Sequence, residues 1–586
     1  MSTENSRLSD PSEDFSNKVK DLLTSYETAK LSILFKTDGT DEILDRSSWS
    51  LVPMICTHLT DENKKTRNSF FLTCEELLQI FADRCNPSET VLLFLEQAES
   101  LPDDVRFCAL LKPLEISLKR GDMSKSIEWV VSTIRAYAED LPLPENTNPE
   151  AVSPGDEEDP VIDRLTTTLR SILDFLSPLI EIALDRVNSD PREVKVLMNL
   201  INIHLNLFSK PFSHLDINPE DSSSVFRVMT SQILRLETNP IKFFEIIENR
   251  IHKRINKLDP EPKIDLYNLQ VQLFDMEVSD LTYANFFFTL MMSLESCQQL
   301  PQVYHPLYIM NCCIYLGNHL LKQPEYVLVT RGLRFLEGIL NRVPEESIQP
   351  EALQLAIHGD LFSSISQVMI YCDSSRERQL ALGVFQGYIR RFSMAGRYRV
   401  LWMLYDRTKH SGLLALIINI FKSSIIISLD RGDKEFLRKL EPIFKRIFRL
   451  PHGSVSDLVE MSDEIIAALN LLRFLVIRDT NNSTGIWKVL KSIQGYLKEL
   501  RDGVDLARAH WKVKLRDLQE ENGKRRRIET QVSVVVGGQE LPDMPVREKI
   551  KFCYQAINAL DVIESIVVRV NECIDTNPMK KLTIIS

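Results

Sequence analysis

Glycine is scarce in this chain of 586 residues, and its scarcity limits the folds that the chain can adopt. Only 19 residues are glycine, about half of the share of roughly 7% that is usual in proteins. Tight β-turns and phosphate-binding loops use glycine because it adopts positive φ angles at little cost. The composition therefore favours helices that are joined by short polar loops.

The sequence motifs of common catalytic sites are also missing. There is no G-x-x-x-x-G-K-[ST] or G-x-G-x-x-G to hold nucleotide phosphates, no H-E-x-x-H to hold zinc, and no G-x-S-x-G around a nucleophilic serine. Composition and pattern therefore predict an interaction protein that is not an enzyme and that needs no cofactor.

None of the ten cysteines forms a C-x-x-C pair, and most lie among apolar neighbours, as free cysteines of a protein core do. This usage is typical of a reducing compartment. Residues 1–14 are polar and acidic and do not resemble a secretory signal. We expect a cytoplasmic protein. The basic run Lys524–Arg527 leaves nuclear import open, although such runs are also common in solvated loops.

The formal charge of −12 disfavours non-specific binding to nucleic acid or to anionic lipid, because attraction to phosphate dominates both interactions. The most apolar stretch is Ser411–Leu429, which Lys422 and several polar side chains interrupt. We interpret this stretch as a buried helix and not as a membrane span. No nucleic-acid or membrane partner is predicted.

Two weaker constellations are better explained by structural roles, one by core packing and the other by the end of a helix. His305, Cys312, Cys313 and His319 contain zinc-ligand types, but adjacent cysteines on a helix point about 100° apart and do not easily share one metal. His358-Gly-Asp360 could pair an imidazole with a carboxylate as a general base. We interpret it as the end of a helix, where glycine is a terminator. No metal site is predicted.

Helical periodicity is nearly continuous after the first residues. In 162–184, apolar side chains recur at steps of three and four, which places them on one helical face. Pro142, Pro191 and Pro240 recur at a spacing of 49, which fits two helices and their turns. We predict an all-α fold, an irregular HEAT/armadillo-like helical-repeat solenoid, with one small β-hairpin near 532–540.

This pattern predicts the organisation of the chain. A disordered tail is expected at 1–14, followed by N-terminal HEAT-like repeats over 15–300. The segment 142–160 is rich in proline and acid, so it is expected to be a loop. C-terminal HEAT-like repeats are expected over 301–586. Solenoids of this kind present long continuous surfaces and typically bind other proteins.

Several stretches of the C-terminal half resemble the glomulin family of HEAT-like inhibitors of cullin–RING ubiquitin ligases. They are HSGLLALIINIFKSSIIISLDR at 410–431, SDEIIAALNLLRFLVIRDTNNSTGIW at 462–487, VSVVVGGQELPDMP at 532–545 and the helix that follows through 575. Weaker similarity covers YHPLYIMNCC at 304–313, RGLRFLEGILNRV at 331–343 and SSWSLVP at 47–53. Their order and spacing together identify the chain as a divergent member.

The resemblance implies a function. Proteins of this family bind the RING domain of the RING-box subunit of a cullin–RING (SCF-type) ligase and cover the face that recruits the ubiquitin-conjugating enzyme. The RING-box subunit and its cullin are therefore the expected partners, and the RING-binding region is expected at about 400–586. A scaffold that joins an FK506-binding immunophilin or a receptor kinase to signalling partners is the alternative.

The resemblance also suggests contact residues. Lys422 matches the lysine of the family's corresponding helix, and His410 and Ser411 match its motif, although they would also serve to cap the helix. The polar loop with Asp479, Asn481 and Asn482 offers further contacts, with Asp479 facing a basic residue of the partner. An ordinary inter-helix loop is the other interpretation of that segment.

Overall fold

The computed structural model describes residues 11–37, 40–100, 103–146, 159–187, 193–221, 223–253, 278–298, 300–301, 303–525, 534–536, 539–541 and 545–577. These residues belong to two compact units. The N-terminal unit lies within Met1–Val343 and Ala356–Val384, and the C-terminal unit lies within Pro344–Leu355 and Phe385–Ser586.

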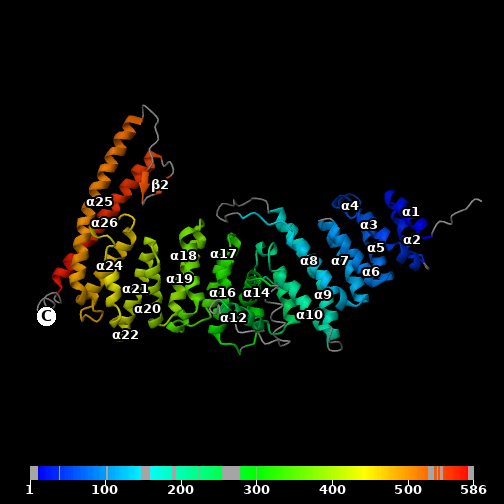
Figure 1. Cartoon of the computed structure of the whole chain (residues 1–586), viewed down its shortest axis with the longest axis horizontal. Coiled ribbons are helices and arrows are strands. Elements are labelled where there is room, and N and C mark those ends of the chain that lie inside the picture. The colour runs from blue at the N-terminus through cyan, green and yellow to red at the C-terminus, as the bar shows by residue number, and fades with distance from the viewer. Residues whose placement is uncertain are drawn as a thin grey trace, which may run out of the picture. The chain divides into compact units, whose positions relative to one another are not determined.

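The N-terminal unit consists of helices, which Figure 1 shows in chain order. They are α1 (Pro11–Thr24), α2 (Thr28–Lys36), α3 (Asp41–Cys56), α4 (Asp61–Thr66), α5 (Asn68–Arg84), α6 (Pro87–Ser100), α7 (Asp104–Arg120), α8 (Met123–Glu139), α9 (Pro160–Val187), α10 (Glu193–Asn206), η1 (Phe212–His214), α11 (Val225–Leu236), η2 (Pro240–Lys242), α12 (Phe243–Lys253), α14 (Asp280–Met292), α15 (Leu294–Gln298), α16 (Pro306–Leu321), α17 (Tyr326–Leu340), α18 (Ala356–Tyr371) and the first part of α19 (Ser375–Arg391).

The C-terminal unit holds the end of α19 and the remaining elements. They are η3 (Pro350–Gln354), α20 (Met394–Arg407), α21 (Ser411–Arg431), α22 (Lys434–Arg438), α23 (Glu441–Ile447), η4 (Gly453–Val455), α24 (Ser462–Arg478), η5 (Ile486–Val489), α25 (Leu490–Arg525), β1 (Val534–Val536), β2 (Gln539–Leu541) and α26 (Val546–Thr576). Strands β1 and β2 pair antiparallel, with Val534 opposite Leu541, so the small hairpin predicted near 532–540 is confirmed.

Alternate helices of the N-terminal unit form two layers. Helices α5, α7 and α9 pack side by side in one layer, and α6, α8 and α10 pack in the other. The apolar periodicity of 162–184 explains this packing, because Leu165, Leu169 and Leu176 are all fully buried on α9. The predicted all-α helical-repeat solenoid is confirmed in the described part of the chain.

Local sequence signals set where individual helices begin and end. The carboxylate of Asp103 accepts the backbone N–H groups of Val105 and Arg106, at 2.9 and 3.1 Å, and so caps the first turn of α7. The last turn of α7 carries Lys119 and Arg120, which complement the negative end of the helix dipole. Gly121 follows as the C-cap residue.

Three predicted boundaries are placed differently by the structure. Helix α1 begins at Pro11 and not after residue 14, because proline suits the first helical position and acidic residues suit the first turn. In the acidic loop 142–160, residues 142–146 have no regular structure, Pro160 already begins α9, and 147–158 lie outside the described residues. The division expected at 300/301 falls within one unit, because α14 packs on α16 across it.

The apolar helix α21 lies in the core of the C-terminal unit. It packs against α20 and α24 and buries Leu413, Ile417, Phe421 and Ile425. Among the described residues, it is the helix that is long and apolar enough to span a membrane by composition alone. Its contacts with α20 and α24 are those of a core helix, as the sequence predicted.

Alanine substitutions at two glycines of the N-terminal unit should change its stability in opposite directions. A Cβ at Gly332 of α17 would lie 2.8 Å from the Cβ of Leu320 on α16, whereas a Cβ at Gly383 of α19 meets no atom within 4 Å. We expect Gly332→Ala to lower the free energy of unfolding by about 1–2 kcal/mol through overpacking. Gly383→Ala should raise it by up to about 1 kcal/mol, because alanine favours helix.

Urea unfolding of the two variants, compared with the parent protein, measures this difference. Equal effects of the two substitutions would contradict a close helix approach at Gly332.

Candidate protein-binding surfaces of the C-terminal unit

Helices α21 and α24 run parallel and are tied together at both ends. At the start, the Ser411 hydroxyl accepts the backbone N–H of Glu464 at 3.2 Å. At the end, Arg478 forms an ion pair with Asp430, with an N–O distance of 3.2 Å. These ties align the two helices along their whole length and fix the surface that they share.

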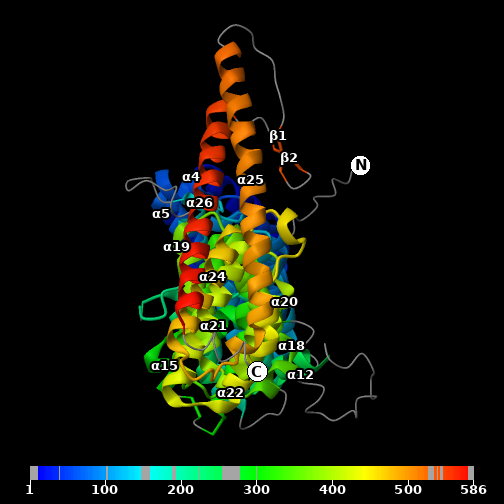
Figure 2. The same cartoon turned by 90° about the vertical axis from the view of Figure 1, so that its left-hand side faces the viewer.

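The long helices α25 and α26 complete the unit and lie side by side in both views (Figure 1, Figure 2). The Asn577 amide donates to the Val476 carbonyl at 2.8 Å, so the C-terminal ends of α26 and α24 meet. The Arg508 guanidinium of α25 binds Asp561 of α26 at 2.9 Å and also contacts Glu564. Further along α25, the Gln519 amide donates to the Tyr554 hydroxyl, which lies earlier in α26, at 3.1 Å, so α25 runs antiparallel to α26.

His410 and Ser411 cap helices. The Nδ1 atom of exposed His410 accepts the backbone N–H of Leu413 at 3.2 Å, which makes His410 the N-cap of α21. Ser411 uses its hydroxyl on Glu464, at the first turn of α24. The capping of α21 that the sequence left open is confirmed for His410, whereas Ser411 caps the start of α24 and not its own helix.

Lys422 lies half-buried in the middle of α21. Its Nζ atom is 5.3 Å from the centre of the Phe474 ring of α24, a cation–π distance. Phe474 is itself half-buried. Lys422 and Phe474 therefore form a small mixed patch on the shared surface of α21 and α24.

Asp479 holds its own loop in place. It is only 2% exposed, and its carboxylate accepts the backbone N–H groups of Ser483 and Thr484 at 2.7 and 2.8 Å. The sequence led us to expect that Asp479 faces a basic residue of a partner. The structure does not place it so, because these bonds turn its carboxylate into the loop. Asn482 adopts a positive φ of 51° and accepts the Trp487 N–H, whereas Asn481 is exposed.

The six predicted contact residues do not form one compact site. His410 and Ser411 lie at the start of α21, while the loop 479–482 lies beside its end. Helix α21 has 21 residues, which at 1.5 Å per residue span about 30 Å. Lys422 lies between the two ends. A partner would have to cover the whole helix length to touch all of these residues.

The histidine and cysteine candidates of the sequence have structural roles. His305 caps α16, and His319 contacts Asp280 at 2.9 Å. Cys312 and Cys313 are buried, and burial raises the pKa of both thiols. Among the described residues no group of three or more potential ligands is placed to hold a metal ion.

His358 is not at the end of a helix, as the sequence suggested. Helix α18 begins at Ala356, directly after η3, so His358 lies in its first turn and the break falls before it. The imidazole is buried, and burial lowers the pKa of His358 to about 4.

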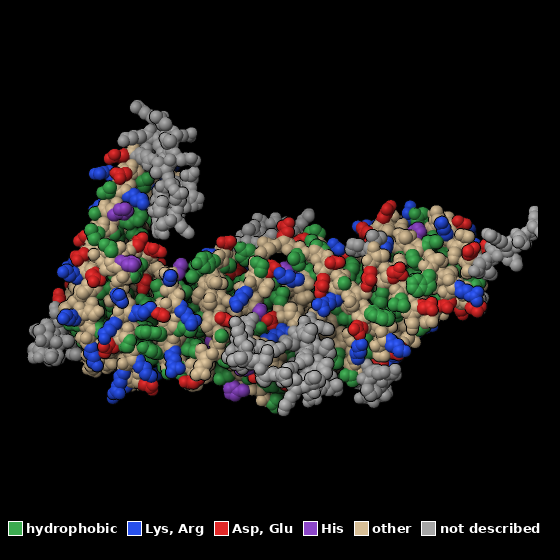
Figure 3. All heavy atoms as spheres, viewed as in Figure 1, with side chains coloured by type: hydrophobic (Ala, Val, Ile, Leu, Met, Phe, Trp, Pro, Cys, Tyr) green, Lys and Arg blue, Asp and Glu red, His purple; other side chains and the backbone are tan. Residues whose placement is uncertain are grey.

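The two units carry opposite net charges in the sequence. The N-terminal unit has 36 Lys and Arg against 55 Asp and Glu, a formal charge of −19. The C-terminal unit has 34 against 27, a formal charge of +7, and Figure 3 shows Lys and Arg side chains spread over its face with α21 and α24. The side chains of Lys524–Arg527 lie outside the described residues. The total of −12 hides this asymmetry between the two units.

A groove of about 490 Å³ lies between η4 and α25, and we call it the η4–α25 groove. Val455, Leu458, Leu506 and Trp511 give it apolar walls. Val455 is 77% exposed and Leu506 is 57% exposed, and Val513 lies two turns further along α25 with 51% exposed. Exposed apolar side chains that line one hollow, as Val455 and Leu506 do, mark interaction surfaces.

The sequence builds this groove by close approach of a loop to a helix. A Cβ at Gly503 would lie 2.9 Å from the Ser454 carbonyl oxygen, so glycine lets α25 touch η4. The ring of Trp511 packs edge-on against Phe552 of α26, with 5.5 Å between ring centres. Polar residues Asp457, His510 and Lys514 line the groove beside its apolar walls. An apolar centre with a polar rim is the usual anatomy of a protein interface.

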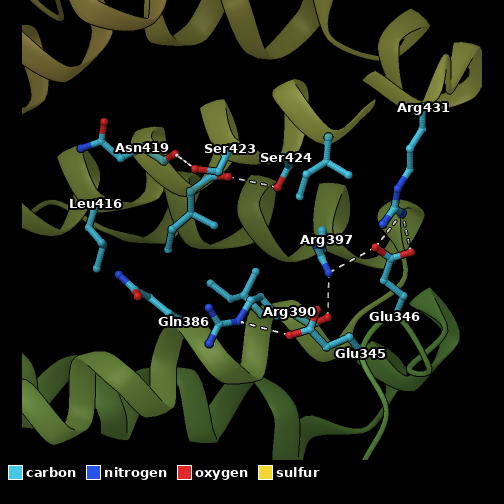
Figure 4. Close-up of a pocket in the computed structure, with 13 residues that line it drawn as sticks. Glu345, Glu346, Gln386, Arg390, Arg397, Leu416, Asn419, Ser423, Ser424 and Arg431 are labelled. Carbon is cyan, nitrogen blue, oxygen red and sulfur yellow. Dashed lines mark hydrogen bonds and ion pairs between the residues drawn. The ribbon is translucent and has the colours of Figure 1, made fainter. Parts of the chain in front are cut away.

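A second hollow, of about 280 Å³, lies between α21, the end of α19 and the segment 345–346, and we call it the arginine pocket (Figure 4). Leu416, Ile420 and Ile427 of α21 form an apolar wall. At the other end, Figure 4 shows Arg397 and Arg431 turned toward the carboxylate of Glu346, and Arg390 turned toward Glu345. Charged and apolar lining therefore meet in one pocket.

Comparisons with known proteins place the chain in a family. The family model described as "Uncharacterised protein family, YAP/Alf4/glomulin" matches residues 226–565. The chain belongs to this family. Human glomulin is 26% identical over 564 residues, covering 94% of this chain and 91% of glomulin. Mouse glomulin is 26% identical over 550 residues, covering 91% and 88%. The resemblance to the glomulin family that the sequence predicted is confirmed.

The groove and the pocket of this glomulin-family chain were not predicted from its sequence. Val455, Leu506 and Val513 stand in short polar contexts that look like ordinary surface, and Glu345-Glu346 lies in a loop far along the chain from α21. Only the exposed fractions and the meeting of distant segments reveal these sites. The matched range 226–565 includes both of them.

Proposed function

We propose that this protein binds the RING domain of the RING-box subunit of cullin–RING ubiquitin ligases and blocks the recruitment of the ubiquitin-conjugating enzyme. The structural observation that supports this proposal is the η4–α25 groove, a hollow in the C-terminal unit with exposed Val455 and Leu506. Membership of the glomulin family supports the proposal.

The chemistry of the groove suits such a partner. The face of a RING domain that docks the conjugating enzyme is apolar with basic residues around it, so a competitor needs an apolar groove with polar, partly acidic edges. The groove offers apolar walls and Asp457 at its edge, and the Glu499 carboxylate lies 3.8 Å from the Cβ position of Gly453. Inhibition by occupation of this face needs no catalytic residue.

Two separate surfaces are candidates for the contact, and they share no residue. One is the η4–α25 groove, and the other is the patch of Lys422 and Phe474 on α21 and α24. A standard interface buries roughly 800 Å² on each partner, so a partner centred on the groove would also have to cover the surface around it. We assign the dominant contact to the groove and a supporting contact to Lys422.

A ubiquitin-chain assay with purified components tests the proposal. The full-length protein should suppress chain formation in a dose-dependent way. Leu506→Glu should raise the concentration needed for half-suppression by about tenfold or more, because it places a charge in a desolvated apolar contact. Lys422→Glu should raise it by a smaller factor.

Two control variants match these substitutions. Val562→Glu changes an apolar residue of α26 that is exposed outside the groove, and Lys434→Glu changes an exposed lysine of α22. Both should suppress chain formation as the parent protein does. If the parent protein leaves the rate unchanged, the proposal is wrong, and a scaffold for an immunophilin or a receptor kinase becomes the preferred function. Unchanged suppression by Leu506→Glu would reject the groove alone.

A further inference from the structure

We propose that the arginine pocket is a binding site for a phosphorylated serine or threonine side chain of a peptide, and that Glu346 occupies the phosphate position when no peptide is bound. This inference goes beyond the proposed RING contact and does not depend on it. It rests on the arrangement of charges in the pocket, on its apolar wall and on the backbone of Glu346.

Guanidinium groups from different helices converge on this pocket. Arg390 comes from the end of α19, Arg397 from α20 and Arg431 from the last turn of α21. They face Glu345 and Glu346, the two carboxylates among the lining residues. Arg391 adds a further guanidinium, at 3.4 Å from Glu345. The pocket lining therefore holds three guanidinium groups against two carboxylates, and an additional anionic group is favoured there.

Glu346 does not satisfy both of the arginines that it faces. Its carboxylate binds Arg431 with two oxygens, at 2.8 and 2.9 Å, but lies 3.6 Å from the nearest nitrogen of Arg397. Arg397 is only 4% exposed and otherwise donates to the carbonyls of Phe392 and Arg390. A carboxylate has two oxygens and one charge, whereas a phosphate ester has three terminal oxygens and nearly two charges, so it can bridge both guanidiniums closely.

The backbone around Glu346 is held in place, so only its side chain has to move when a phosphate enters. Glu346 adopts a positive φ of 60°, which a residue with a Cβ seldom adopts and which costs on the order of 1 kcal/mol. Neighbouring backbone hydrogen bonds hold the segment against α19, from the Glu346 N–H to the Arg390 carbonyl and from the Ile348 N–H to the Arg391 carbonyl. The Glu346 side chain can therefore rotate away while the segment stays in place.

The rest of the pocket selects a peptide over a free ion. The pocket has a volume of about 280 Å³, near nine times the roughly 30 Å³ that one water molecule takes up in the liquid. A single phosphate ion is only a few times larger than a water molecule, so it leaves most of the pocket unfilled. The apolar wall of Leu416, Ile420 and Ile427 suits aliphatic side chains beside the phosphorylated residue. The side-chain amide of Asn419 also lines the pocket and offers a donor to a peptide backbone.

Isothermal titration of the full-length protein with three probes tests the inference. The probes are the peptide acetyl-Leu-phosphoserine-Leu-amide, the same peptide without phosphate, and inorganic phosphate. We expect the phosphopeptide to bind at least tenfold more tightly than inorganic phosphate, and the unphosphorylated peptide to give no binding. Equal affinity for phosphopeptide and inorganic phosphate would overturn the assignment to a peptide.

Three variants locate the binding site. Glu346→Gln removes the competing carboxylate and should tighten phosphopeptide binding about threefold to tenfold. Arg431→Gln should weaken it by tenfold or more, and because Arg431 is exposed, the fold should be kept, which circular dichroism checks. Arg399→Gln, an exposed arginine of α20 outside the pocket, should bind as the parent protein does. If no variant changes the affinity, or if even Glu346→Gln binds no phosphopeptide, the inference is wrong.

Discussion

Replacing Arg331 with methionine should lower the free energy of unfolding of the N-terminal unit by about 3 kcal/mol or more. Arg331 of α17 is buried and donates to the carbonyls of Ser213 and Leu215, each at 2.8 Å, and to the side chain of Asn285. Burial lowers the pKa of Arg331 to about 9, so it stays charged at neutral pH.

The size of this effect follows from the acceptors that the substitution would leave behind. Methionine fills a similar volume but donates no hydrogen bond, and each buried acceptor left without a donor costs about 1–3 kcal/mol. Removing a buried charge recovers part of that cost, since the guanidinium was itself desolvated. The contacts join α17 to the η1 region more than 100 positions earlier in the chain, so their loss loosens long-range packing.

Urea unfolding and hydrogen exchange of the amides at 212–215 measure the change. Arg334→Met is the matched control, because Arg334 lies on the same helix and is exposed, and it should change the free energy by less than about 0.5 kcal/mol. Equal losses from the two variants would show that Arg331 is not a structural tie.

Replacing Asp280 with asparagine should cost about 3 kcal/mol at neutral pH, and the cost should shrink in acid. The Asp280 carboxylate accepts from Arg250 at 2.6 Å, from the Tyr315 hydroxyl at 2.8 Å and from His319 at 2.9 Å. Burial by itself would raise the pKa of Asp280. The hydrogen bonds and charges of His319, Arg250 and Tyr315 outweigh burial and hold this pKa well below its usual range.

The sign of the pH dependence follows from this lowered pKa. A carboxyl group whose pKa is lower in the folded state stabilises the fold fully above its unfolded pKa of about 3.9, and this contribution is lost as the pH falls below that value. The difference between parent protein and Asp280→Asn should therefore narrow below pH 4.

Urea midpoints at pH 7, 5, 4 and 3 test this expectation. Asp174→Asn is the control, because Asp174 is an exposed residue of α9, and it should leave the midpoints unchanged at every pH. A difference that stays constant down to pH 3 would contradict the role given to the Asp280 carboxylate.

The candidate surfaces show where sequence reasoning stops. Lys422, His410 and Ser411 were found through a resemblance, and the structure gives His410 the capping role that short-range patterns already suggested, whereas Ser411 bonds to the distant helix α24. Asp479 has the sequence of an exposed loop residue but is buried by hydrogen bonds to Ser483 and Thr484. Whether a polar side chain points outward or into its own loop depends on local backbone geometry, which residue type does not reveal.

The sequence by itself determined the fold class, because the period of apolar residues and the scarcity of glycine constrain local backbone conformation directly. Helix faces such as Leu165–Leu176 on α9 and the hairpin of β1 and β2 follow from that information. The tertiary structure alone decided which distant segments meet. Glu346 reaches Arg431 across 85 positions, and Ser454 reaches Gly503 across η4 and α25. Such contacts depend on the packing of whole helices, and a single sequence carries no local signal for them.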